Sequence, residues 1–379
     1  MAAIIGVGLT PFGQFPEQSI DDLGVEAIRL ALADAELAIH GVQSVYCANA
    51  LGAMLLGDTT IGQSICARLG IRKIPVVNVE NACTSGSTAF HLAQQAIDAG
   101  ACEIALVVGV EKMCIPGFGL INSGKSDVDT QMGMVTPVGF ALRAMRHMHE
   151  FGTTVTQLAQ VTVKSRLHAS QNPLAQFRRR ETVEDILSAP LIADPLTRPQ
   201  CCPIADGAAA LVLASDSMAR VLRRAVKVRH SVLSSGSYHN PMDLVRWETD
   251  YRTAQLAYEG ASLGPGDIDV VECHDAFTIA EILHYEALGL CLPGEGGPLV
   301  ESGATTLGGR VPVNVSGGLL SRGHPVAATG VAQLVEVVTQ LRHEAGPRQV
   351  PNCRIGLAHC MGGDKAGDTK SCTISILSN

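Results

Sequence analysis

The chain has 379 residues, of which 46% are hydrophobic and 17% are charged, and its formal net charge is −8. This composition is typical of a folded protein with two domain-sized cores or one large interlocked body. A negative chain without a long basic run is a poor match for a nucleic-acid-binding protein. No apolar run reaches the roughly 20 residues that span a bilayer. The N-terminus lacks the basic start of a signal peptide, so we expect a cytoplasmic protein.

The 12 cysteines include no C-x-x-C pair, which argues against a zinc ribbon or a dithiol redox centre. Cys353, His359, Cys360 and Cys372 have ligand-type side chains, but their spacing fits no standard metal site. We therefore expect no metal, and free thiols in a reducing compartment.

In the first 110 residues, apolar runs typical of strands alternate with helical periodicity. This alternation predicts a layered α/β body with a parallel or mixed sheet. The predicted strands are residues 3–7, 43–48, 74–77 and 103–109, and the predicted helices are residues 20–38, 61–69 and a run beginning near 89.

Residues 115–195 interrupt this rhythm. Gly117, Gly119 and Gly124 indicate loops, and the helices expected at 138–151 and 156–170 are polar or mixed. We interpret the segment as an insertion packed over the main body. Core strands resume at 206–213 and 226–233.

The second half of the chain repeats the order of the first. Each half has a strand, a short apolar run, a turn of small residues, an amphipathic helix and a second strand. The matched pairs are 42–47 with 268–274, 74–79 with 311–315, and 103–107 with 354–358. The first small-residue turn carries Cys83 and the second carries His324, so the repeat predicts that the two lie close to a pseudo-twofold axis. We place the N-terminal half at 1–235 and the C-terminal half at 236–379.

Cys83 lies between a predicted strand and a predicted helix. The unpaired N–H groups at a helix start favour thiolate over thiol, and the thiolate is the nucleophile. A buried structural cysteine is the alternative at this point.

Three further positions have side chains suited to the same chemistry. His324 precedes Pro325 at a predicted helix start and can act as a base for a thiol. His274 ends a strand, where ligands gather in α/β bodies, although a structural histidine is equally consistent with the pattern. Cys360 precedes Met361 and Gly362, so one loop offers a second thiol and a backbone oxyanion donor.

Taken together, these motifs resemble the thiolase family, most closely its sterol-carrier-protein-type branch. The resemblance covers essentially the whole chain, in order. The motifs that carry it are Asn81-Ala82-Cys83-Thr84-Ser85-Gly86, residues 201–209 (CCPIADGAA), His274-Asp275-Ala276-Phe277, and Gly323-His324-Pro325 with Ala328-Thr329-Gly330.

The resemblance implies the thiolase fold, in which two αβαβα-type halves are stacked and a loop domain is inserted in the first. It also implies a homodimer or tetramer that acts on acyl-coenzyme A, with no tightly bound cofactor. By this analogy Cys83 takes the acyl group and His324 activates it. His324 and His274, the latter through a water, hold the thioester oxygen. The N–H groups of Cys83 and Gly362 form a second oxyanion hole.

The sequence departs from its nearest branch at the proton shuttle. That branch has a cysteine where this chain has Ala276, whereas other thiolases have it in a Cys-x-Gly-Gly-Gly loop. Cys360 matches that loop, with Asp364 in place of the last glycine, so Cys360 is the expected acid/base. The His-Asp-Ala-Phe form also resembles thiolases that work beside an OB-fold, zinc-ribbon partner protein.

The family's pantetheine path maps onto Met132, Cys202, Ile204 and Phe277. The leading hypothesis is a thiolase that cleaves 3-oxoacyl-CoA or runs the reverse Claisen condensation. The alternatives are a thiolase-fold acyltransferase or retro-aldolase with a non-CoA carbon acceptor, and a non-catalytic scaffold that binds acyl-CoA or lipid. Chain length and direction of reaction are open.

Overall fold

The computed structural model describes residues 2–117, 128–219, 224–237, 243–365 and 367–379. The loop expected around Gly119 and Gly124 lies outside the described residues.

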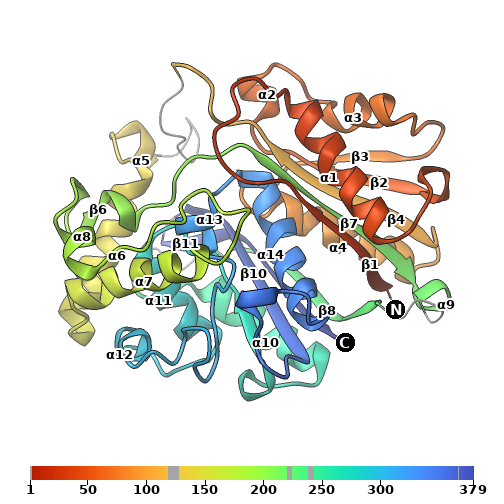
Figure 1. Ribbon diagram of the computed structural model, residues 1–379. Coiled ribbons are helices and arrows are strands. Elements are labelled where there is room, and N and C mark those ends of the chain that lie inside the picture. The colour runs from red at the N-terminus through yellow and green to blue at the C-terminus, as the bar shows by residue number, and fades with distance from the viewer. Residues whose placement is uncertain (1, 118–127, 220–223, 238–242, 366) are drawn as a thin grey trace.

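A single nine-stranded sheet runs through the molecule in the order β3-β2-β4-β7-β1-β8-β11-β10-β9 (Figure 1). β2, β3 and β4 are mutually parallel, whereas β7 runs antiparallel to both β4 and β1. The strands are β1 (Ala2–Leu9), β2 (Ser44–Ala48), β3 (Val76–Val79), β4 (Ile104–Glu111), β7 (Gly207–Ser215), β8 (Val226–Ser235), β9 (Val270–Glu272), β10 (Ile355–Lys365) and β11 (Asp368–Ser378).

The strand order is symmetric about the contact between β1 and β8, and this symmetry confirms the predicted duplication. β1 and β8 pair antiparallel, with Ala3 opposite Lys227 and Ile4 opposite Val226. Outward from this contact, β7, β4 and β2 in one half correspond to β11, β10 and β9 in the other. The pairing types agree, since β9 and β10 are parallel and β10 and β11 are antiparallel.

One repeat differs from the expectation. Residues 311–315, the counterpart of β3, form only an isolated parallel bridge between Val313 and Val271. Pro312 has no N–H to donate to a ladder. Asn314 has a φ of 55°, which ends the extended run.

The two halves of the sheet form two strand layers, because α4 (Ser85–Asp98) and α14 (Val326–Leu341) pack between them, and α14 contacts both β4 and β10. With helices on the outer faces as well, the layering is α-β-α-β-α, and the expected fold class is confirmed. The outer layers contain α1 (Ile20–Asp34) with α3 (Ile61–Leu69), and α10 (Glu248–Ala261) with α11 (Thr278–Ala287). α14 is buried along almost its whole length, and among its polar residues Glu336 is paired with Arg348 at 3.0 Å.

Two glycines let α14 approach the N-terminal half closely. A Cβ on Gly86 of α4 would lie 2.3 Å from the Ala327 carbonyl oxygen, and one on Gly109 of β4 would lie 2.4 Å from the same atom. Any side chain at either position would push the start of α14, and with it the nearby His324, away from the turn that carries Cys83.

The insertion forms the lobe at the left of Figure 1. It contains α5 (Val128–Gln131), α6 (Thr136–Phe151), α7 (Val155–Ala169), α8 (Val183–Leu187), and the hairpin of β5 (Leu191–Ala193) with β6 (Leu196–Thr197). α7 is more buried than its polar sequence suggests, because its polar side chains have buried partners. Lys164, for example, donates to Glu281 of α11 at 2.6 Å and to the Val313 carbonyl at 3.1 Å.

The remaining elements are short connectors. They are α2 (Gly52–Leu55), α9 (Asp216–Ala219), α12 (Gly296–Glu301), α13 (Gly318–Arg322), and the single 3₁₀ turns η1 (Ile39–Gly41), η2 (Arg198–Gln200), η3 (Pro265–Asp267) and η4 (Gly346–Arg348). Among the described residues, no helix has the length and apolar character needed to cross a membrane.

Candidate active site

Cys83 lies on the tight turn between β3 and α4. Ala82, with a φ of 49°, reverses the chain just before it. Thr84 donates to the Asn81 carbonyl and Ser85 donates to the Ala82 carbonyl, each at 2.6 Å. The Asn81 N–H donates back to the Ser85 hydroxyl at 2.8 Å. These local bonds explain why small hydroxyl residues surround the cysteine, because together they fix the turn.

His324 stands just before α14, on a turn that Gly323 makes possible with a φ of 109°. Pro325 caps the helix rather than occupying its first turn. The Thr329 hydroxyl donates to the Pro325 carbonyl at 2.9 Å, so its oxygen accepts from Nδ1–H of His324 at 2.7 Å. The other nitrogen, Nε2, is therefore unprotonated and available as a base.

His274 follows β9, at the carboxyl end of that strand. Its ring lies edge-on to that of His324, with centroids 5.1 Å apart and an interplanar angle of 83°. The Cys83 sulfur and one nitrogen of each imidazole all lie within 4.8 Å of one another. The duplicated architecture therefore brings the thiol of one half to the imidazoles of the other, as the repeat predicts.

Cys360, on β10, lies against His274 and is 1% exposed. Its sulfur is 3.4 Å from Nδ1 of His274 and donates to the Cys83 carbonyl at 3.2 Å. It does not belong to the wall of the cavity described below. The second thiol is thus next to the site, but it contacts the imidazole rather than the open space.

Two backbone N–H groups face the Cys83 sulfur. They are those of Gly363 and of Cys83 itself, and both act to lower its pKa. Gly362 allows close packing, because a Cβ there would lie 2.4 Å from the Ser371 hydroxyl. Gly363 therefore lies beside the nucleophile, and the role of the Gly362 N–H in a second oxyanion hole stays a prediction.

Burial decides the protonation states of these groups. Burial, with a contribution from the Glu111 carboxylate, raises the pKa of the Cys83 thiol to about 12. Burial also lowers the pKa of His324 to about 3, with a contribution from Arg322, and holds the pKa of His274 well below its usual range. The helix start favours the Cys83 thiolate by at most about 2 kcal/mol, and desolvation outweighs this effect on the pKa. The resting site holds a neutral thiol and neutral imidazoles.

A cavity of about 1700 Å³ opens beside these groups. Cys83, His274 and His324 belong to its wall, together with the expected Cys202, Ile204 and Phe277. Its volume exceeds the roughly 300–1,000 Å³ of ordinary ligand pockets, so it can admit a long ligand.

Met132 does not belong to this wall. It follows α5, is 83% exposed, and is replaced at the cavity by Met134, two residues further on. The family motif therefore identifies the segment that reaches the cavity, but the methionine in the cavity wall is Met134 rather than Met132.

Five arginines line the same cavity, which the sequence did not indicate. They are Arg143, Arg166, Arg178, Arg179 and Arg198. Arg166 is paired with Glu181 at 2.7 Å. The run at 178–180 reads as an ordinary solvated face in the sequence, and only the fold of the insertion shows that two of its members face the cavity.

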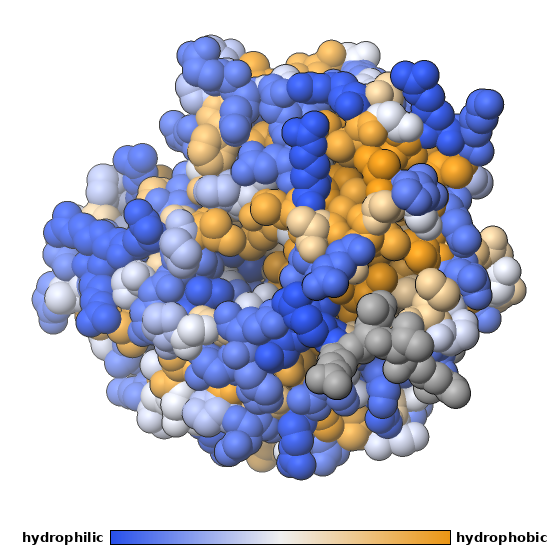
Figure 2. All heavy atoms as spheres, turned by 45° about the vertical axis from the view of Figure 1, so that its right-hand side comes forward, coloured by the Kyte–Doolittle hydropathy of each residue, from blue (hydrophilic) through white to orange (hydrophobic). Residues whose placement is uncertain are grey.

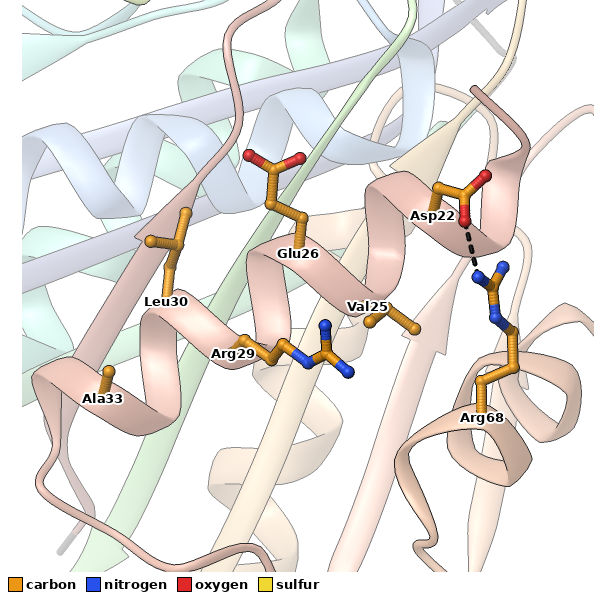
Figure 3. A pocket seen from close by; sticks show the side chains of 7 residues that line it. All are labelled: Asp22, Val25, Glu26, Arg29, Leu30, Ala33 and Arg68. Carbon is orange, nitrogen blue, oxygen red and sulfur yellow. Dashed lines mark hydrogen bonds and ion pairs between the residues drawn. The ribbon is translucent and has the colours of Figure 1, made fainter. Parts of the chain in front are cut away.

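A second hollow lies on the outer face of α1, with a volume of about 660 Å³ (Figure 3). It is lined by α1 side chains such as Glu26, Arg29 and Leu30, and an Asp22–Arg68 ion pair lies at one end. It contains no thiol or imidazole, so it has none of the groups that the candidate chemistry needs.

Two groups of side chains in the described part of the chain are close enough to hold a metal ion. One is the Cys83, His274 and His324 site itself, and the other is Asp250, His359 and Cys372, which are fully buried. The absence of a metal stays a prediction.

Fold and site define a class of α/β enzyme in which a cysteine and two histidines from duplicated halves share one end of a long cavity. Comparison with known proteins agrees. Residues 2–217 match the family model described as "Thiolase, N-terminal domain", and residues 231–378 match "Thiolase C-terminal domain-like". The chain belongs to the thiolase family, and it is an acyltransferase.

Individual relatives agree with this assignment. The chain is 41% identical to the acetyl-CoA acetyltransferase of Methanothermobacter thermautotrophicus, over 95% of this chain and 96% of that protein. It is 37% identical to sterol carrier protein 2 of Homo sapiens, over 95% of this chain and 69% of that protein. A solved structure titled "Ltp2-ChsH2(DUF35) aldolase" superposes with a TM-score of 0.86 at 26% identity, covering 100% of this chain and 97% of that one. The proposed boundary between halves at 235 and 236 stays a prediction.

Proposed function

We propose that the protein is a thiolase that cleaves 3-oxoacyl-CoA with coenzyme A, or condenses two acyl-CoA molecules, through an acyl-enzyme on Cys83. The observation that carries the proposal is the approach of the Cys83 sulfur and the His274 and His324 nitrogens to within 4.8 Å, in the wall of a cavity of about 1700 Å³.

In the first half-reaction, Nε2 of His324 takes the thiol proton and the Cys83 thiolate attacks the acyl carbonyl. With an acyl-CoA donor, the new bond from the Cys83 sulfur to the acyl carbon replaces the carbon–sulfur bond to coenzyme A, and the leaving thiolate takes the proton from His324. In the cleavage of 3-oxoacyl-CoA the carbon–carbon bond breaks instead, and the leaving enolate takes up a proton. The oxyanion that forms transiently accepts hydrogen bonds from the N–H groups of Cys83 and Gly363. A neutral resting pair suits this role, because a base is needed only when substrate has arrived.

In the second half-reaction, a carbanion or enolate equivalent must be formed or neutralised near the same sulfur. His274 and His324 converge where the thioester oxygen would lie, so they can stabilise enolate charge. Cys360 acts as acid/base in contact with His274, since its sulfur lies 3.4 Å from the imidazole Nδ1. The proton passes between this thiol and the carbon that reacts by way of the His274 imidazole, which belongs to the cavity wall.

Coenzyme A is a cosubstrate in this scheme, not a tightly bound cofactor. Arg178 and Arg179 supply positive charge to the cavity wall for its phosphates, and Cys202, Ile204 and Phe277 form apolar wall for the pantetheine arm. Phe277 is held in place by stacking on Phe140 of α6, with ring centroids 4.2 Å apart.

The test is intact-protein mass spectrometry after mixing with acetyl-CoA, followed by peptide mapping. We expect one acetyl group on Cys83, and none in Cys83→Ala. A coenzyme A thiolysis panel of short, long and branched 3-oxoacyl substrates then identifies the acyl chain. A wild-type protein that is neither acetylated nor active on acetoacetyl-CoA would refute the proposal.

A retro-aldolase with a partner protein is the second candidate. It is favoured by the structural neighbour whose title names an aldolase of two components, and by Ala276 in place of the usual cysteine. Co-purification with an OB-fold, zinc-ribbon protein, and cleavage of a β-hydroxyacyl-CoA without acetylation of Cys83, would favour this candidate over the thiolase.

A homodimer or tetramer is proposed as the assembly. β3 is an edge strand, and Figure 2 shows hydrophobic residues gathered over the N-terminal half. The large exposed apolar side chains of that half include Met54, Leu56 and Val77. An exposed apolar edge of this kind is what a second copy would cover. Light scattering of the purified protein measures the assembly directly.

A further inference from the structure

A group of buried polar side chains lies next to His274 and takes no part in the steps above. Asp250 of α10, His284 of α11 and His359 of β10 have no solvent exposure. They come from three separate elements and converge on the chain segment that carries His274. Polar groups buried to this degree are costly unless they are paired, so their convergence calls for a function.

One carboxylate oxygen lies close to both imidazoles. Oδ2 of Asp250 is 3.2 Å from Nδ1 of His284 and 3.3 Å from Nε2 of His359. Burial alone would raise the pKa of Asp250, but the neighbouring His284 and His359 imidazoles keep it far below its usual range. The Asp250 side chain at the centre of the group is therefore ionised.

One of the two imidazoles in turn holds the backbone of His274, because the His274 N–H donates to Nδ1 of His359 at 3.5 Å. His284 packs against His359, with ring centroids 4.3 Å apart. The Trp247 ring stacks on His284, with centroids 5.0 Å apart, and supports that imidazole from the other side. A single buried carboxylate thus stands behind the imidazole that holds His274, and His284 packs beside that imidazole.

The alternative is a metal ion, because Asp250, His359 and Cys372 offer donors within 4.8 Å of one another. The tautomer of His359 decides against it. Its Nδ1 accepts the His274 N–H, so its Nε2 carries the proton and has no lone pair for a metal.

We propose that Asp250 is a positioning residue for His274. Through His359, which His284 packs beside, it fixes the segment after β9 so that Nδ1 of His274 meets Cys360 while the imidazole keeps its place in the cavity wall. The inference rests on the proposed function, in which His274 and Cys360 serve the enolate step and Cys83 with His324 serves acylation. Loss of Asp250 should therefore separate the two half-reactions.

The experiment compares wild type with Asp250→Asn. Single-turnover acetylation of Cys83 by acetyl-CoA is followed by quenched-flow mass spectrometry, and kcat for acetoacetyl-CoA thiolysis is measured on the same preparations. We expect acetylation within twofold of wild type and a 10- to 100-fold lower kcat. The matched control is Glu286→Gln, which weakens another buried carboxylate–histidine pair, with His147 at 3.1 Å, outside the cavity wall. Both of its rates should stay within twofold.

Each other outcome counts against the proposal. A parallel loss of both rates in D250N would mean general disruption, and an unchanged kcat would mean that His274 needs no support. One equivalent of zinc in wild type that D250N lacks would assign the cluster to a metal. If D250N does not fold, His359→Gln is measured in the same way, with the same split expected. A wild type that is not acetylated at all refutes the proposed function itself, independently of any variant.

Discussion

Replacing Thr329 by valine should slow the acylation of Cys83 about 10- to 100-fold. The fully buried hydroxyl of Thr329 accepts from Nδ1–H of His324 at 2.7 Å and donates to the Pro325 carbonyl at 2.9 Å. When His324 takes the proton of Cys83 it becomes an imidazolium, and a hydrogen bond to a charged group contributes about 1.5–3 kcal/mol. At about 1.4 kcal/mol per factor of ten, the loss corresponds to the stated range.

The assay is again single-turnover acetylation, with Thr339→Val as the control. Thr339 lies in the same helix and makes the same type of bond, to the Val335 carbonyl at 2.8 Å, but it has no contact with His324. We expect its acylation rate to match that of wild type. A folded T329V that acylates as fast as wild type, or a T339V that is equally slow, would refute the assignment of Nε2 as the base.

Three further predictions follow from the same site. Arg179→Ala should raise the KM for coenzyme A about 5- to 10-fold with little change in kcat, and this rise in KM should shrink at high salt. Arg180 is next in the chain but outside the cavity wall, so Arg180→Ala should change neither KM nor kcat. Alkylation of Cys83 by iodoacetamide should rise about tenfold per pH unit from pH 7 to 10, because its pKa of about 12 leaves the thiolate a minor species throughout; a plateau below pH 9 would contradict this. Asp364→Gly restores the glycine loop of other thiolases but removes the carboxylate partner of buried Arg143, which among the described residues keeps only its hydrogen bond to the Leu244 carbonyl. Urea unfolding should therefore show a loss of about 1.5–3 kcal/mol, and assays should show no gain in kcat.

The repeat in the sequence predicted the duplication and the meeting of Cys83 with His324, and the family resemblance implied the thiolase fold. Strand and helix patterns recur in the same order in both halves, and a duplicated α/β unit leaves few ways to arrange them. The failures within the fold are local. Residues 311–315 repeat the apolar pattern of their counterpart, but one proline and one left-handed residue prevent a full strand.

The chemistry of the site was predicted less well, because it depends on burial. The ionisation expected for Cys83 followed from the helix start alone, whereas its pKa is set by desolvation that no local pattern reveals. Whether Met132 or Met134 faces the cavity, and whether Gly362 or Gly363 lies beside the Cys83 sulfur, depends on single turns of the backbone. Asp250 was missed because its partners come from distant segments without any spacing that could indicate them.

The position of α14 has a consequence for the synthesis of the protein. This helix is shared by both halves, and only β10 and β11 follow it as longer elements. A nascent chain that has not yet released this helix carries Cys83 without His324 fixed beside it, and leaves the inner faces of α4 and β4 uncovered. The thiol therefore gains its base only after α14 has left the ribosome and packed on α4.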